Sequence, residues 1–333
     1  MRTDEARSGV IRQAPADAID TTGVYASLDD LVRLQYRVQG MTFLPKQPVH
    51  SILSGRHASR MRGRGLNFEE IRGYLPGDDV RTIDWKVTAR TQKTHVRVFT
   101  EERDRPALTV VDQRCAMFFG TRRALKSVVA AETAAASAWR ILDQGDRPGA
   151  VVFDDAGWEV IRPHRSRKTV MRILETIVEK NHALNADSAT PSNPTMLNRV
   201  LETVNQRTGH DHLITIISDF DGVDEESDRL LTRLARHNDV LAVPIYDPSA
   251  ETGLPGGRLV VSGGELQMEI DTARGSVEQR MRDVVDKRVS RVMSWQDKLG
   301  VPVLPLSTER DPLDQVREML GALPGMRRGG SRR

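Results

Sequence analysis

The feature that most constrains the fold is an apolar run that ends on a carboxylate. Residues 107–111 are uncharged and mostly aliphatic, and Asp112 follows them directly. A run of this length and composition predicts a buried strand of a parallel sheet. Side chains at the carboxyl end of such a strand face the crevice in which α/β proteins bind ligands. The sequence therefore predicts an α/β protein with a candidate site at Asp112.

A second apolar run, over residues 212–218, ends on Asp219 in the same way. Further strands are predicted at 149–154, 158–162, 240–246 and 301–304, and helices at 121–142, 166–180, 195–206, 225–237, 274–298 and 312–321. This alternation is typical of a doubly wound, mostly parallel sheet with helices on both faces. Because parallel strands end at one edge, we expect Asp112 and Asp219 to meet there.

The chain has 333 residues, which is enough for two modules with buried cores. Composition divides it further. We predict a disordered arm at 1–26, a short helix with a β-rich Arg and Gly module at 27–105, an α/β domain at 106–322 with a hairpin insertion at about 255–271, and a basic disordered tail at 323–333.

Charge is spread unevenly, although the formal net charge is only +3. Residues 51–105 carry twelve Lys or Arg against eight Asp or Glu. The clustered arginines at 56–64 leave nucleic-acid binding open as an alternative. No aromatic residue is interleaved with them, so a solvated or partner-facing loop is favoured and no nucleic-acid partner is expected.

The single cysteine, Cys115, excludes an internal disulfide. No apolar run approaches the roughly 20 residues of a membrane-spanning helix. We therefore expect a cytoplasmic protein without direct membrane insertion. Cys115 could pair with a histidine as a nucleophile, but a cysteine at a buried strand exit more often serves as packing.

The region before the first strand holds a dense series of short motifs. They read GRHAS at 55–59, GRG at 63–65, FEEIR at 68–72, YLPGDDVR at 74–81, IDW at 83–85 and AR at 89–90. This series resembles the signature of the bacterial domain-of-unknown-function 58 family. The resemblance implies a fold of von Willebrand factor A type. It also implies an association with MoxR-type AAA+ ATPases, beside which such proteins are thought to assist the assembly or maturation of other proteins.

A fold of this type further implies a comparison with the metal-ion-dependent adhesion site. That site holds Mg²⁺ with a strand-end Asp, two hydroxyls, a hydroxyl from a later loop and a second Asp. The resemblance places Asp112 and Asp219 at the two carboxylates. It places Thr195 or Ser192 at the later hydroxyl.

The pair of hydroxyls is missing, because Arg114 and Ala116 stand at those positions. We therefore predict a degenerate site without a structural metal, which binds Mg²⁺ weakly at most. Our hypothesis is that Arg114 takes the place of the ion and neutralises Asp112 or Asp219 by a charge-assisted hydrogen bond. The alternative is that Arg114 faces solvent and Asp112 caps the next turn.

A second constellation of charged and aromatic residues precedes the first strand. It comprises Arg72, Asp78, Asp79, Arg81, Asp84 and Trp85. The Pro-Gly pair at 76–77 and the carboxylates after it predict a turn with local hydrogen bonds. One interpretation is an ion-pair network that braces this module on the sheet. The other is a surface that binds a partner.

Together these features predict a non-enzymatic adaptor or scaffold that binds protein partners at the strand-end crevice. Arg114 would receive a carboxylate from the partner there. A MoxR-type AAA+ ATPase is the expected partner, with other von Willebrand factor A-like proteins beside it. No catalytic residue and no cofactor are predicted. The alternatives are a metal-dependent hydrolase that uses Asp112 and Asp219, and nucleic-acid binding through residues 56–64.

Overall fold

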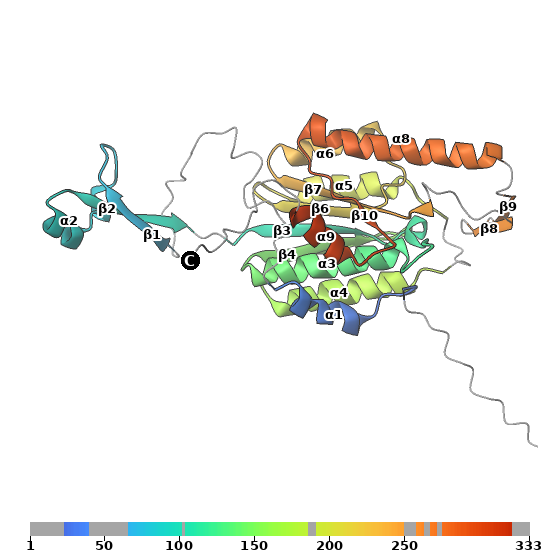
Figure 1. Cartoon of the computed structure of the whole chain (residues 1–333), viewed down its shortest axis with the longest axis horizontal. Helices are drawn as coiled ribbons and strands as arrows, with labels where there is room; N and C mark the ends of the chain where they lie inside the picture. Colours follow the sequence, from blue (N-terminus) through green and yellow to red (C-terminus); the bar gives the residue numbers. More distant parts are fainter. Residues whose placement is uncertain are drawn as a thin grey trace, which may run out of the picture.

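The computed structural model describes residues 23–39, 66–101, 104–185, 191–249, 258–262, 267–271 and 275–321. Most of the predicted arm, the basic tail and the arginine cluster at 56–64 lie outside these residues. Figure 1 shows a six-stranded sheet between layers of helices, and a smaller hairpin module that precedes it in the chain.

The larger part alternates strands and helices as expected. Its helices are α1 (Leu28–Arg37), α3 (Lys126–Asp143), α4 (Arg167–His182), α5 (Met196–Arg207), α6 (Glu225–Ala235), α8 (Gly275–Leu299) and α9 (Pro312–Gly321), with a 3-10 turn η3 (Cys115–Met117). Its strands are β3 (Pro106–Asp112), β4 (Arg147–Phe153), β5 (Trp158–Ile161), β6 (Leu213–Ser218), β7 (Asp239–Tyr246) and β10 (Leu306–Ser307). The predicted hairpin insertion forms from β8 (Arg258–Ser262) and β9 (Gln267–Asp271).

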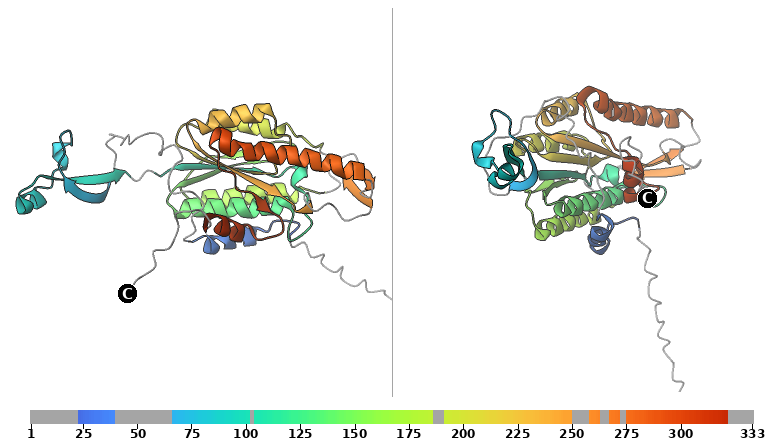
Figure 2. Two further views of the ribbon diagram at one scale, coloured as in Figure 1. Left: turned by 45° about the horizontal axis from the view of Figure 1, so that its top comes forward. Right: turned by 60° about the vertical axis from the view of Figure 1, so that its left-hand side comes forward.

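The sheet places the two strands that end on carboxylates side by side. Its order is β10-β7-β6-β3-β4-β5, and neighbours are parallel except for β5, which pairs antiparallel with β4 at one edge. Helices α1, α3 and α4 cover one face, and α5, α6 and α8 cover the other (Figures 1 and 2). The predicted doubly wound, mostly parallel α/β sheet is confirmed.

Aliphatic and aromatic side chains fill both layers of the core. Trp139 and Ile173 are buried on one face of the sheet, and Leu197 and Trp295 on the other. Burial of each such side chain stabilises the fold by about 1.5–3 kcal/mol. This packing on both faces of the sheet holds the strand ends in fixed positions relative to one another. None of the helices in the described part of the chain combines the length and hydropathy needed to cross a membrane.

Helix α1 packs on the larger part, which corrects the predicted domain boundary. Leu31 is buried in the core that α3 and α4 share, and the indole N–H of Trp139 donates to its carbonyl at 3.0 Å. The backbone N–H of Ala26 donates to the side-chain oxygen of Asn181 at 2.7 Å. Residues 23–39 therefore belong with the α/β domain, and neither with the β-rich module nor with a disordered arm.

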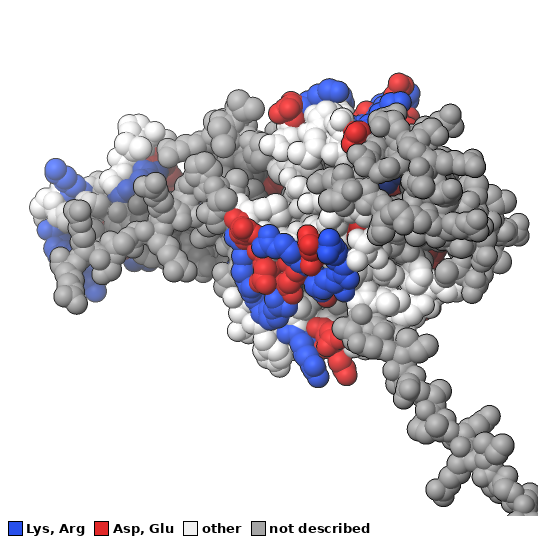
Figure 3. Space-filling model, turned by 45° about the vertical axis from the view of Figure 1, so that its right-hand side comes forward, with Lys and Arg blue, Asp and Glu red and all other residues white. Residues whose placement is uncertain are grey.

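Ion pairs tie the first described helix to the last. Figure 3 shows positive and negative side chains interleaved in one patch on the face in view. Arg37 of α1 donates to Asp311, just before α9, at 2.9 Å, and Arg317 of α9 donates to the Arg37 carbonyl at 2.9 Å. Such exposed pairs contribute little singly, but together they fix the position of the two helices.

The hairpin module consists of β1 (Leu66–Gly73) and β2 (His95–Glu101), which pair antiparallel, with η2 (Val80–Thr82) and α2 (Trp85–Thr91) between them. Asp78 accepts two bonds from Arg72 at 2.8 and 2.9 Å, and Asp84 accepts one from Arg97 at 2.8 Å. These pairs join residues of the module to one another. The interpretation in which they brace the module on the sheet is therefore wrong for these carboxylates.

The last predicted strand is only partly formed. In place of a strand at 301–304, the structure has a single bridge between Val303 and Ala242, followed by the short β10. Pro302 and Pro305 have no backbone N–H to donate, so a continuous ladder cannot form across them.

Candidate functional site

Arg114 lies inside the protein, against the carboxylate that ends β3. Its side chain is 1% exposed, and that of Asp112 is fully buried. The guanidinium donates through Nε to Asp112 Oδ1 at 3.0 Å and through Nη2 to Oδ2 at 2.7 Å. The predicted charge-assisted hydrogen bond is therefore present, and it is bidentate. Asp112 Oδ1 also accepts the backbone N–H of Arg114 at 3.0 Å, so the alternative is right that Asp112 caps the next turn and wrong that Arg114 faces solvent.

The other N–H groups of Arg114 point to backbone carbonyls. Nη1 and Nη2 donate to the carbonyl of Asp221 at 3.1 and 3.2 Å, and Nη1 lies 3.4 Å from the carbonyls of Asn193 and Pro194. Asp219 Oδ1 is 3.9 Å from Nη2. One guanidinium therefore joins the loop after β3, the loop after β6 and the loop before α5. The two strand-end carboxylates meet at one edge of the sheet, with this cation between them.

Two further cations face Asp219. Lys126 Nζ, from α3, is 2.5 Å from Asp219 Oδ2, and Arg288 Nη1, from α8, is 3.6 Å from the same oxygen. Burial acts to raise the pKa of Asp219, but Lys126, Arg288 and Arg114 together lower it below its usual range. Neither Lys126 nor Arg288 was predicted, because nothing in the pattern of either helix points to this edge.

Asp112 is held differently from Asp219. Complete burial raises the pKa of Asp112, while hydrogen bonds from Arg114 and from the Ser218 hydroxyl, at 2.6 Å, oppose the rise. Burial also acts to lower the pKa of Arg114, but the negative charges of Asp112 and Asp219 raise it instead. Arg114 therefore stays charged. Because its N–H groups point at both oxygens of Asp112, we describe the two residues as a buried ion pair.

Asp155, which follows β4, is a part of the site that was not predicted. Its Oδ2 accepts the backbone N–H of Cys115 at 2.6 Å, and its Oδ1 accepts that of Asn193 at 2.7 Å. Asp155 thus joins two of the loops that Arg114 joins. It lies just past the end of its strand, as Asp219 does, and Asp112 is the last residue of β3, so the same pattern could have identified Asp155. Burial, with the charge of Asp155, raises the pKa of the Cys115 thiol, which disfavours a nucleophilic thiolate.

The residues expected to supply a later hydroxyl are exposed, whereas Asp112 and Asp219 are buried. Thr195 is exposed, and its hydroxyl donates to the Asn193 side chain at 2.8 Å. Ser192 is also exposed, and Ala116 lies in η3, where it has no side-chain ligand to offer. Within the described ranges, no three His, Cys, Asp or Glu side chains are grouped so that they could hold a metal ion.

The predicted partner-binding residues fall into two separate groups. Arg114 is buried with its N–H groups directed at partners within the chain, so it does not fit the role of receiving a carboxylate from outside. The others, which are Arg72, Asp78, Asp79, Arg81, Asp84 and Trp85, all belong to the hairpin module. In that group Trp85 is 69% exposed.

Asp247, which follows β7, is a further strand-end carboxylate that binds neighbouring loops. It accepts bonds from the N–H and the hydroxyl of Thr121 at 2.8 and 2.7 Å, and from the hydroxyl of Thr308 at 2.5 Å. Burial alone would raise the pKa of Asp247, but hydrogen bonds from Ser249, Thr308 and Thr121 lower it to about 2. The carboxylate is therefore stabilised in its ionised form.

The Asp247→Asn variant is expected to be roughly 1–2 kcal/mol less stable than the wild type near neutral pH. A carboxylate whose pKa is lowered by folding contributes stability above its unfolded pKa of about 3.9, and this contribution is lost as the pH falls towards 2. Urea denaturation should show the difference between variant and wild type shrinking over that acid range. Asp30→Asn, at a 72% exposed side chain, is the control. A difference that does not change with pH would contradict this account.

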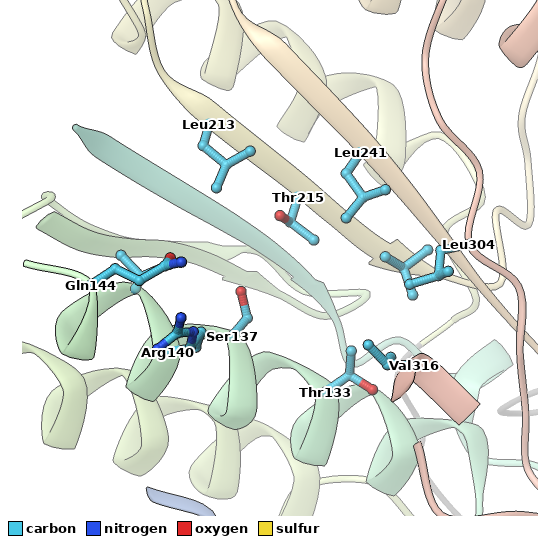
Figure 4. Close-up of a pocket in the computed structure, with 11 residues that line it drawn as sticks. Thr133, Ser137, Arg140, Gln144, Leu213, Thr215, Leu241, Leu304 and Val316 are labelled. Atoms are coloured by element: carbon cyan, nitrogen blue, oxygen red, sulfur yellow. The ribbon is translucent and has the colours of Figure 1, made fainter. Parts of the chain in front are cut away.

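A separate pocket lies between α3 and the sheet (Figure 4). Thr133, Ser137 and Arg140 line it from α3, and Leu213 and Thr215 line it from β6. Neither Asp112 nor Asp219 borders this pocket, so it is not part of the site at the carboxyl edge.

Comparisons with known proteins identify the family. The chain matches the family described as protein of unknown function DUF58 over residues 70–292. Uncharacterized proteins of Mycobacterium tuberculosis and Mycobacterium bovis are 30% identical to it over 326 residues, which cover 94% of this chain and 98% of theirs.

Two solved structures show a more distant likeness. The conserved hypothetical protein BatB from Bacteroides thetaiotaomicron has 10% identity and a TM-score of 0.37, over 65% of this chain and 97% of its own. An aerotolerance-related membrane protein from Bacteroides fragilis has 11% identity and a TM-score of 0.35, over 63% of this chain and 94% of its own. The family match alone spans more than half of the sequence, and the chain therefore belongs to the DUF58 family.

Proposed function

We propose that this protein is a non-enzymatic adaptor that binds protein partners at the carboxyl edge of its sheet, in the service of a MoxR-type AAA+ ATPase. The observation that carries the proposal is Phe119, an aromatic side chain that is 41% exposed on a loop at this edge. The Arg114 guanidinium, between Asp112 and Asp219 and against three backbone carbonyls, fixes the loops of the edge from within. The ATPase is proposed from the family resemblance of the motifs at 55–90.

The same contacts argue against a metal-dependent hydrolase. Mg²⁺ prefers an octahedral shell of oxygen ligands, several of them waters. To reach Asp112, the ion would have to displace a guanidinium that donates hydrogen bonds to both oxygens of this carboxylate, at 3.0 and 2.7 Å. Asp219 is likewise engaged by Lys126. Asp112 and Asp219 therefore hold the loops in place. This geometry does not favour either carboxylate as a general base.

The rim of the edge offers a surface for a partner. Phe119, in the loop after η3, is 41% exposed, and Lys126 Nζ lies 6.0 Å from the centre of its ring. Because Lys126 also contacts Asp219, the ring lies next to the buried charge cluster. Thr195 is exposed on the loop before α5, which Arg114 ties to the same edge through the Pro194 carbonyl. Exposed aromatic side chains on fixed loops often dominate the energy of protein interfaces.

Replacing Phe119 by serine is expected to weaken binding to the purified MoxR-type ATPase of the source organism by on the order of tenfold. Biolayer interferometry with the immobilised ATPase measures the dissociation constant directly. Tyr36→Ser is the matched control, because Tyr36 is an aromatic residue with 70% exposure on α1. The proposal is contradicted if the wild type shows no saturable binding, or if Phe119→Ser binds as tightly as Tyr36→Ser.

A further inference from the structure

Large apolar side chains are exposed on the short connection between β1 and β2. Leu75 is 60% exposed, Val80 61% and Trp85 69%. A single exposed apolar residue needs no explanation, but these three fall within eleven consecutive residues of one small module. Tryptophan in particular is enriched among the residues that dominate binding energy at interfaces.

The connection is held in a defined shape by hydrogen bonds of its own. Asp78 accepts the backbone N–H of Leu75 at 2.8 Å in addition to its pair with Arg72. Asp84 accepts the N–H groups of Lys86 and Val87 at 3.0 Å each, which caps the start of α2 next to Trp85. A surface ordered before binding loses less conformational entropy when a partner docks.

The charges around these side chains are mainly positive. Between residues 71 and 97 there are six Lys or Arg and three Asp, and Asp78 and Asp84 both bond within the module. Lys86 and Arg90 are exposed and lie four residues apart on α2, which puts them on one face of the helix. Figure 3, where the module lies at the left, shows positive side chains spread over it among uncharged ones.

We propose that Trp85, Leu75 and Val80 bind an apolar groove that is bordered by carboxylates on a protein partner. This inference rests on the proposed adaptor function. A second surface would let the protein bind two partners at once, one at the carboxyl edge and one at the module. The groove supplies apolar contact for the indole, and its carboxylates face Lys86 and Arg90.

The contacts favour a protein over a membrane or a nucleic acid. Helices that lie on membranes bury a long apolar face, whereas α2 has seven residues and carries threonine, lysine and arginine. Single-stranded nucleic acids are held by several stacking aromatics, and Trp85 is the large aromatic side chain that the described part of the module exposes.

Photo-crosslinking in cells of the source organism tests this proposal. The photo-reactive residue p-benzoylphenylalanine replaces Trp85, or, as the control, Tyr36, whose ring is equally exposed on α1. We expect position 85 to form an adduct with one protein, on a peptide that mass spectrometry places beside surface Asp or Glu residues. The double reversal Lys86→Glu/Arg90→Glu should reduce its yield by on the order of tenfold. The matched reversal Arg162→Glu/Lys168→Glu, at exposed residues of the α/β domain, should leave the yield unchanged.

The proposal is overturned if position 85 reacts no more than position 36, if its adduct is lipid or nucleic acid, or if the yield survives the double reversal. Binding at the carboxyl edge is tested separately, by the dissociation constant of the Phe119→Ser variant. A protein adduct at position 85 together with unaltered binding of that variant would support the module surface and reject the edge.

Discussion

Replacing Arg114 by methionine is expected to lower the free energy of unfolding by about 3–5 kcal/mol. Methionine has a similar length, but it leaves Asp112 fully buried without its cation and frees the carbonyls of Asp221 and Pro194. A buried carboxylate without a partner is among the most destabilising features a core can contain. Urea denaturation followed by circular dichroism measures the change.

A second variant separates lost charge pairing from lost packing. The double variant Arg114→Met/Asp112→Asn removes the buried negative charge together with the cation, so we expect it to regain a large part of the lost stability. Arg114→Lys keeps the charge but not the fork of N–H groups, and should fall between wild type and Arg114→Met. A loss below about 1 kcal/mol for Arg114→Met would show that the ion pair does not hold the loops together.

The Gly222→Ala variant is expected to lose about 2–4 kcal/mol of stability and to disturb the same site. Gly222 has a φ of +80°, and a Cβ built there would lie 2.3 Å from the carbonyl oxygen of Pro194. That carbonyl is also near the Arg114 guanidinium, at 3.4 Å from Nη1. The loop before α5 must therefore move away, and it would take one of the acceptors of Arg114 with it.

Gly300→Ala is the matched control for this clash. Gly300 also has a positive φ, of +64°, but a Cβ there would meet nothing within 4 Å. Its substitution should cost only the strain of the left-handed backbone, roughly 1–2 kcal/mol. Thermal denaturation of both variants compares the two. Equal losses would mean that the close approach of Gly222 to Pro194 has no role in the site.

The meeting of two carboxylates at one edge of the sheet could be predicted from the sequence alone. Apolar runs that end on Asp112 and Asp219 predict adjacent parallel strands, and the sheet places β3 beside β6. Arg114 could be predicted as a replacement for an ion because an arginine stands where the resemblance requires a hydroxyl. Its burial could not be predicted. That depends on the carbonyls of loops more than 75 residues away in sequence, at Asn193 and Asp221.

Other parts of the structure depended on contacts that no local pattern encodes. Lys126 and Arg288 contact Asp219 from helices on opposite faces of the sheet. The spacing of apolar residues in either helix therefore gives no indication that these two side chains approach the same carboxylate. The prediction that α1 belongs with the β-rich module was wrong for a similar reason. Its amphipathic pattern indicates that a face is buried, but not that α3 and α4 bury it. By contrast, Asp155 follows a predicted strand closely and could have been identified.

The most direct test of the account is a calorimetric titration of the full chain with Mg²⁺. If the Arg114 guanidinium fills the space between Asp112 and Asp219, the wild type should give only heats of dilution at millimolar metal. A saturable isotherm with submillimolar affinity, abolished by Asp112→Ala, would show instead that the carboxylates serve a cation from solution.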